Sequence, residues 1–148
     1  MNENELIQML HWYQPEKSQE EAVCALAKIY TNPSKKLDNL FMLLGKHSWE
    51  NYCRIVPKTG ENRHTAIYSL LGLLGDMTWP GAYQAVDVLS IMETEDLIPK
   101  LEEIITKAYN NNDPPWLAGL KILVTQLQPE VYALLDKDTI EYLKKADY

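Results

Sequence analysis

The residues best suited to chemistry are two cysteines and three histidines, and their spacing matches no common site. They are Cys24, Cys53, His11, His47 and His64. Metal ligands on a helix usually stand three or four residues apart, or as close Cys-x-x-Cys pairs. His47 and Cys53 are six residues apart, which puts them on different faces of a helix, and His64 lies beyond a proline and a glycine. We therefore predict no metal site, and we expect both cysteines to be buried, reduced thiols.

The acidic residues and the glycines offer no catalytic motif either. Adjacent acids such as Glu20 and Glu21, or Glu102 and Glu103, fit solvated helix faces. General acid–base catalysis needs a carboxyl group in a perturbed environment, and nothing in the spacing indicates one. The chain has no phosphate-binding glycine loop and no nucleophile elbow. The sequence predicts no catalytic residue and no cofactor.

The aromatic residues are the more informative group, with four tryptophans and nine tyrosines against one phenylalanine. Aromatic rings that carry a polar atom are enriched at protein interfaces. Most of them are expected to be half-buried at helix edges. The alternative is that some line a groove that grips a partner. The candidates for such a binding surface are Tyr52, His64, Tyr83 and Tyr109.

One phrase occurs twice in the chain. Residues 76–82 read DMTWPGA and residues 113–119 read DPPWLAG, an offset of 37. An offset in this range is typical of architectures built from repeated helix pairs. Each copy lies between two apolar stripes of helical spacing. The phrase therefore indicates the turn inside a helical hairpin and the start of its second helix.

The residue types in the phrase suit structural roles. Asp76 and Asp113 are placed to accept hydrogen bonds from the amides of a turn or a helix start. Pro80 fits an early helical position, where an amide hydrogen has no internal partner, and Gly81 allows close approach of a neighbouring helix. We expect the two tryptophans to wedge between hairpins, largely buried at equivalent places. They are Trp79 and Trp116.

Apolar residues recur at helical spacing nearly throughout the chain. The clearest stripe comprises Leu97, Ile98, Leu101, Ile104, Ile105 and Ala108. No run alternates as a half-buried strand does. Prolines and short polar turns divide the stripes into segments of helix length without a long linker. The sequence predicts one all-α domain over residues 1–148, a short α-solenoid of about nine or ten helices in antiparallel hairpins.

The segment around the first copy resembles the HEAT family of helical repeats. The places of its leucines, turn aspartate, large apolar residue and alanine are filled here by Leu70, Leu71, Leu74, Asp76, Trp79 and Ala82. The arginine usual after the large apolar residue is replaced by Pro80, which removes the aspartate–arginine ladder between HEAT units. The chain is also similar to small bacterial proteins of unknown function that carry D-x-x-W-P-G-A and a stretch like SWENYCRIV at 48–56. The resemblance covers about residues 37–95. It implies a HEAT-like fold and no particular activity.

Charge and hydropathy indicate which classes of partner the chain could bind and in which cellular compartment it is expected. The net charge is −7, and only two of the 14 basic residues are arginines. Nucleic-acid binders usually present a basic face, so DNA and RNA are not expected partners. No apolar run is long enough to cross a bilayer, and the first residues lack the basic start of a signal peptide. These features favour a cytoplasmic protein without a membrane partner.

The absence of catalytic motifs favours a non-catalytic protein-interaction module in a bacterial cytoplasm. Its partner is expected to be another protein, and one specific version is an immunity-type protein that neutralises a toxin. The alternative is an enzyme or small-ligand binder that uses a cleft near His64, Asp76 and Trp79. A third alternative is a structural subunit that associates with itself.

Overall fold

The computed structural model describes residues 1–146, and every regular element in that range is a helix. The prediction of an all-α fold is confirmed. The α-helices are α1 (Glu3–Gln8), α2 (Glu16–Ile29), α3 (Leu37–Met42), α4 (Trp49–Ile55), α5 (Ile67–Leu73), α6 (Ala82–Ser90), α7 (Thr94–Asn110), α8 (Pro114–Gln126), α9 (Pro129–Tyr132) and α10 (Lys137–Leu143). The 3₁₀ segments are η1 (Lys46–Ser48), η2 (Val56–Ala66, bent at Gly60) and η3 (Lys144–Ala146).

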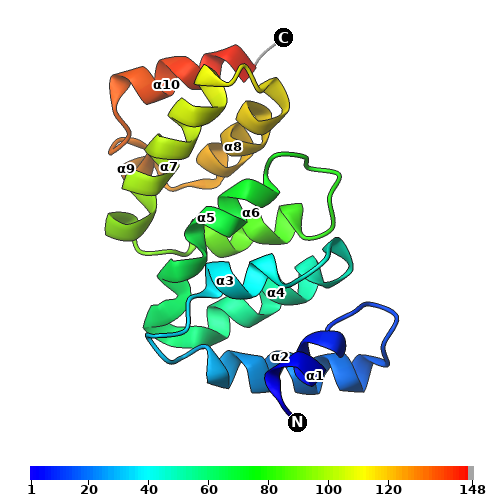
Figure 1. The fold of residues 1–148 in the computed structure, drawn as a ribbon. Coiled ribbons are helices and arrows are strands. Elements are labelled where there is room, and N and C mark those ends of the chain that lie inside the picture. The colour runs from blue at the N-terminus through cyan, green and yellow to red at the C-terminus, as the bar shows by residue number, and fades with distance from the viewer. Residues whose placement is uncertain (147–148) are drawn as a thin grey trace.

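The helices follow one another in pairs from one end of the molecule to the other. Figure 1 shows α1 and α2 at the N-terminal end and α10 at the opposite end. Helices α2, α4, α6 and α8 contact one another in that order, and α3, α5, α7 and α10 do the same beside them. The turns within the pairs lie along one edge, on the right in Figure 1, and the connections between pairs lie along the other.

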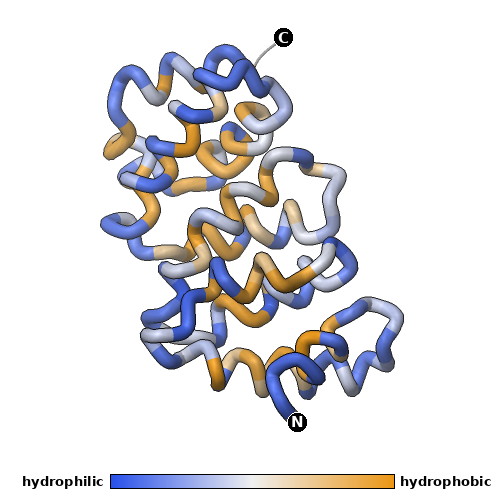
Figure 2. Tube along the Cα trace, viewed as in Figure 1, coloured by the Kyte–Doolittle hydropathy of each residue, from blue (hydrophilic) through white to orange (hydrophobic). Residues whose placement is uncertain are grey.

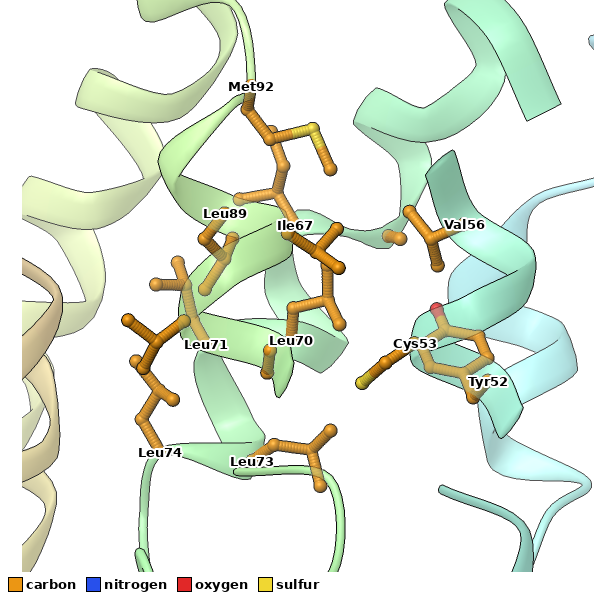
Figure 3. Close-up of a cluster of buried hydrophobic side chains, with 14 of the residues drawn as sticks. Tyr52, Cys53, Val56, Ile67, Leu70, Leu71, Leu73, Leu74, Leu89 and Met92 are labelled. Atoms are coloured by element: carbon orange, nitrogen blue, oxygen red, sulfur yellow. The ribbon is translucent and has the colours of Figure 1, made fainter. Parts of the chain in front are cut away.

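Helix α5 lies in the middle of its row and packs against α6 of the other row. Leu70, Leu71, Leu73 and Leu74 are almost completely buried there, and Figure 3 shows them among side chains of α4 and α6. Figure 2 shows apolar stretches (orange) along the helices in the middle of the molecule and hydrophilic stretches (blue) mainly at its turns and ends. Burial of these leucine side chains stabilises the fold by roughly 1.5–3 kcal/mol each.

A buried asparagine fastens the connection between α2 and α3. The side-chain amide of Asn62 in η2 donates hydrogen bonds to the carbonyl oxygens of Tyr30 and Lys35, both at 2.6 Å. It also lies 3.3 Å from the carbonyl oxygen of Asn32. Carbonyl groups at a helix end have no hydrogen-bond donor within the helix, so the Asn62 amide supplies donors that the α2 backbone lacks.

Candidate functional site

The first copy of the repeated phrase forms a turn. The Asp76 carboxylate accepts hydrogen bonds from the Thr78 hydroxyl at 2.6 Å and from the Thr78 amide at 2.9 Å. These bonds from Thr78 hold the pKa of Asp76 below its usual range. Helix α6 begins only at Ala82, directly after Gly81, whose φ of 89° is left-handed. The predicted role of Asp76 in the turn is confirmed.

The second copy forms a helix start instead. The Asp113 carboxylate accepts a hydrogen bond from the Trp116 amide at 3.2 Å, as an N-cap residue does, and α8 begins at Pro114. The indole Nε1 of Trp116 donates to the carbonyl oxygen of Leu71 at the end of α5, at 3.0 Å. The second copy therefore docks α8 onto the preceding helix pair.

The prediction that both tryptophans are largely buried at equivalent places is wrong. Trp79 lies in the loop and is 38% exposed, whereas Trp116 lies in the first turn of α8 and is partly buried. The turn through Pro80 and Gly81 delays the helix start in the first copy, which leaves the tryptophan outside the helix. Trp79 packs edge-on against Trp49, with the ring centroids 5.7 Å apart.

Replacing Trp116 by phenylalanine tests the docking role of the second copy. Trp116→Phe keeps most of the apolar contact but leaves the Leu71 carbonyl without its indole donor. We expect a loss of about 1–2 kcal/mol in the free energy of unfolding, measured by urea denaturation. The same change at Trp79 should cost less, because that ring is more exposed. Equal losses at the two positions would contradict the difference between the copies.

The structure places His64 apart from Asp76 and Trp79, the other two residues predicted to lie near one cleft. His64 is exposed and lines two adjoining pockets of about 380 and 360 Å³, which also share Glu61. Asp76 and Trp79 lie beyond the other end of α5, whose seven residues separate them from His64 by about 10 Å of helix rise. The three residues therefore belong to opposite edges of the molecule.

The four candidate surface residues do not make one surface. Tyr52 is completely buried, so its assignment to a binding surface is wrong; Figure 3 shows its ring in the core. Its hydroxyl lies 2.7 Å from the Ser69 hydroxyl, a fixed partner that lets the ring be buried. Tyr83 is 60% exposed on α6. Tyr109 on α7 is partly buried and stacks on Tyr142, with centroids 4.1 Å apart.

The two thiols lie in different environments. Cys53 is buried, and burial raises the pKa of its thiol to about 12, with the Glu50 carboxylate adding to the shift. A thiol with so high a pKa is a poor nucleophile at neutral pH. Cys24 is exposed, contrary to expectation, because it lies on the outer side of α2. Within residues 1–146, no three His, Cys, Asp or Glu side chains gather closely enough to hold a metal ion.

Four of the exposed apolar side chains lie instead in two neighbouring turns, at positions that the sequence pattern did not indicate. Tyr13 and Met42 are each 82% exposed, Leu43 is 62% exposed, and Trp12 is also exposed. We call these four residues the loop patch. Trp12 and Tyr13 belong to the turn after α1, and Met42 and Leu43 end α3. The one sequence feature that indicates this surface is the pair of large aromatic residues, Trp12 and Tyr13, in a short segment between two helices.

A groove of about 270 Å³ lies between α1 with the turn after it and the end of α3, and Leu43 is the one residue of the loop patch among its lining residues. Ile7, His11, Leu43 and Leu44 are among the residues that line it. His47, in η1, joins the turn after α1 to η1: its ring centroid is 4.4 Å from that of Trp12 and 4.8 Å from that of His11, and its carbonyl oxygen accepts a hydrogen bond from the Trp12 amide at 3.2 Å. The rings at this edge are therefore packed against one another.

Hydrogen bonds fix the backbone that carries the exposed rings. The Gln19 side-chain amide donates to the Gln14 carbonyl at 2.7 Å and lies 3.3 Å from the Trp12 carbonyl. The Asn51 amide donates to the Leu10 carbonyl at 2.7 Å from within the core. A segment held in place before binding loses less conformational entropy when a partner binds. The loop patch is thus exposed and pre-organised.

No family model, curated protein or solved structure matches the chain. Over residues 1–146, no helix combines the length and the apolar character that a bilayer crossing needs. The resemblance to HEAT repeats stays a prediction.

Proposed function

We propose that this chain is a non-catalytic protein-interaction module that binds another protein through the loop patch. The observation that carries the proposal is the concentration of exposed Trp12, Tyr13, Met42 and Leu43 at one edge. Exposed apolar patches of this kind mark interaction sites, and tryptophan, tyrosine and methionine are enriched at the centre of interfaces. Large rings on a fixed backbone are also the side chains that dominate binding energy.

The scaffold we propose is a short HEAT-like α-solenoid. The order of contacts between successive helices in two parallel rows supports it. Each pair in such a stack contacts only its neighbours, so turns on one edge line up and present an extended surface. The loop patch and Trp79 lie on that edge of turns.

The specific version of the proposal is an immunity-type protein of a bacterial cytoplasm. The support is the net charge of −7, which steers association with a basic protein through long-range attraction. The apolar patch would then supply the short-range contact.

A capture experiment from the native host tests the proposal. Immobilised wild-type protein should retain a protein partner at physiological salt. The double variant Tyr13→Ser with Met42→Ser should lose it, since both side chains are largely exposed and leave the fold intact. Tyr83→Ser is the matched control, an equally polar change at an exposed tyrosine on α6. Capture of no partner, or equal capture by the double variant, would contradict the proposal.

A further inference from the structure

We propose that Asn51, a buried residue of α4, is a positioning residue of the loop patch. It acts through Gln19 of α2, and the two side chains together hold the turn that carries Trp12 and Tyr13. The inference rests on the proposed function, because it names the groups that keep this surface ready for a partner. Asn51 is only 6% exposed, so its effect on binding would be indirect.

The Asn51 side chain uses both of its polar atoms inside the molecule. Its nitrogen donates to the Leu10 carbonyl oxygen at 2.7 Å and to Gln19 Oε1 at 2.8 Å. Its oxygen accepts a hydrogen bond from Arg54 Nη1 at 2.9 Å. A backbone carbonyl can only accept and a guanidinium can only donate, so the nitrogen and the oxygen of Asn51 cannot exchange places.

The orientation of Asn51 determines that of Gln19. Because the Asn51 nitrogen donates to Gln19 Oε1, the Gln19 nitrogen points the other way, toward the turn. It lies 2.7 Å from the Gln14 carbonyl oxygen and 3.3 Å from that of Trp12. A reversal of the Gln19 amide would place its oxygen against these two carbonyl oxygens, where no hydrogen atom separates them.

The amides at the tip of the turn bond locally. Those of Tyr13 and Gln14 donate to the ring and to the carbonyl oxygen of His11. These bonds shape the turn, whereas the contacts from Gln19 tie it to α2. We expect the Tyr13 ring to move more freely when the Gln19 contacts are lost. Freedom gained by the unbound patch is lost again on binding, which weakens the affinity for a partner.

Asn51→Asp tests the direction of these hydrogen bonds. The carboxylate can still accept from Arg54, but it offers Gln19 only acceptors. The Gln19 amide should then reverse and leave the turn carbonyls without its donor. We expect the amide hydrogens of Trp12 and Gln14 to exchange with deuterium about tenfold faster than in the wild type, measured residue by residue by NMR.

A second substitution should repair the first. The ammonium group of Gln19→Lys has donors only, so it can donate both to the carboxylate of Asn51→Asp and to the Gln14 carbonyl. Gln19→Lys alone should loosen the turn, because its ammonium group would meet the Asn51 nitrogen. In the double variant, exchange should return to within about threefold of the wild-type rate. Residues with separate structural roles would not cancel each other's effects in this way.

Asn62→Asp is the matched control, the same change at a buried asparagine of η2. It removes donors from a different connection and leaves the contacts of Gln19 intact. Amides that exchange by local opening do not respond to a loss of global stability. The turn amides of Asn62→Asp should therefore exchange at the wild-type rate.

Capture from the native host separates this inference from the proposed function. Asn51→Asp keeps every side chain of the loop patch, yet it should capture the partner roughly tenfold more weakly, with recovery in the double variant. Unchanged exchange in the turn, no repair by Gln19→Lys, or equal capture by Asn51→Asp would overturn the positioning role, even where Tyr13→Ser with Met42→Ser abolishes capture. If exchange responds as expected but the wild type captures no protein, the proposed function is wrong and Asn51 still positions the turn.

Discussion

A Gly119→Ala variant should be destabilised by about 3 kcal/mol or more in its free energy of unfolding. A Cβ atom on residue 119 would lie 2.0 Å from the carbonyl oxygen of Leu74 and 2.9 Å from its carbonyl carbon. Both are backbone atoms at the end of α5, so no side-chain rotation relieves the overlap. The methyl group would push α8 away from α5 and stretch the bond from the Trp116 indole to Leu71.

Gly72→Ala is the matched control for this prediction. Gly72 lies in α5, is exposed, and has no atom within 4 Å of a Cβ built on it. Because alanine favours the helix over glycine, this variant should gain up to about 1 kcal/mol. Urea denaturation followed by circular dichroism measures both variants. If Gly119→Ala unfolds at the same urea concentration as the wild type, α8 does not pack as closely on the end of α5 as the structure indicates.

An Asn62→Asp variant should also lose about 3 kcal/mol or more. Asn62 is buried, and its amide nitrogen lies 2.6 Å from the carbonyl oxygens of Tyr30 and Lys35. Aspartate has nearly the same shape but replaces the donor with a carboxylate oxygen, which would face those oxygens without a hydrogen. The buried charge and the unsatisfied carbonyls are both unfavourable.

The same substitution at an exposed asparagine isolates the effect of the site. Asn39→Asp, on the exposed side of α3, should change the stability by less than about 0.5 kcal/mol. The deficit of Asn62→Asp should shrink as the pH falls, because a protonated carboxyl group can donate one hydrogen bond. Equal stabilities of the two variants at neutral pH would show that Asn62 does not hold the α2–α3 connection.

The helical periodicity is sufficient to predict an all-α fold, and the aspartates of the phrase accept the hydrogen bonds that their positions predict. The burial of the two tryptophans cannot be predicted in the same way, because the two copies differ in backbone conformation. In the first copy α6 begins six residues after Asp76, behind a turn through Pro80 and the left-handed Gly81, whereas α8 begins directly after Asp113. Identical spacing along the chain therefore gives different positions in space.

The candidate surface failed for a related reason. The sequence does not distinguish a tyrosine whose hydroxyl is hydrogen-bonded inside the core from one whose hydroxyl is hydrogen-bonded to water. The Tyr52 hydroxyl is hydrogen-bonded to the Ser69 hydroxyl and the Leu37 carbonyl oxygen, so its ring is buried, whereas Tyr13 is exposed. The loop patch joins segments about 30 residues apart, at 12–13 and 42–43, and only the packing of α1 and α3 turns beside each other reveals it.

Oxidative footprinting of the loop patch tests most directly whether this surface is the one that is covered. Hydroxyl radicals oxidise exposed tryptophan, tyrosine and methionine side chains, so Trp12, Tyr13 and Met42 report on the patch and Tyr83 on a different surface. The chain is compared in dilute buffer and after addition to an extract of its native host. We predict that oxidation of the three patch residues, each measured relative to that of Tyr83, falls several-fold in the extract, because a host protein covers them and leaves Tyr83 exposed. Unchanged oxidation of the patch, or protection of Tyr83 alone, would contradict the account.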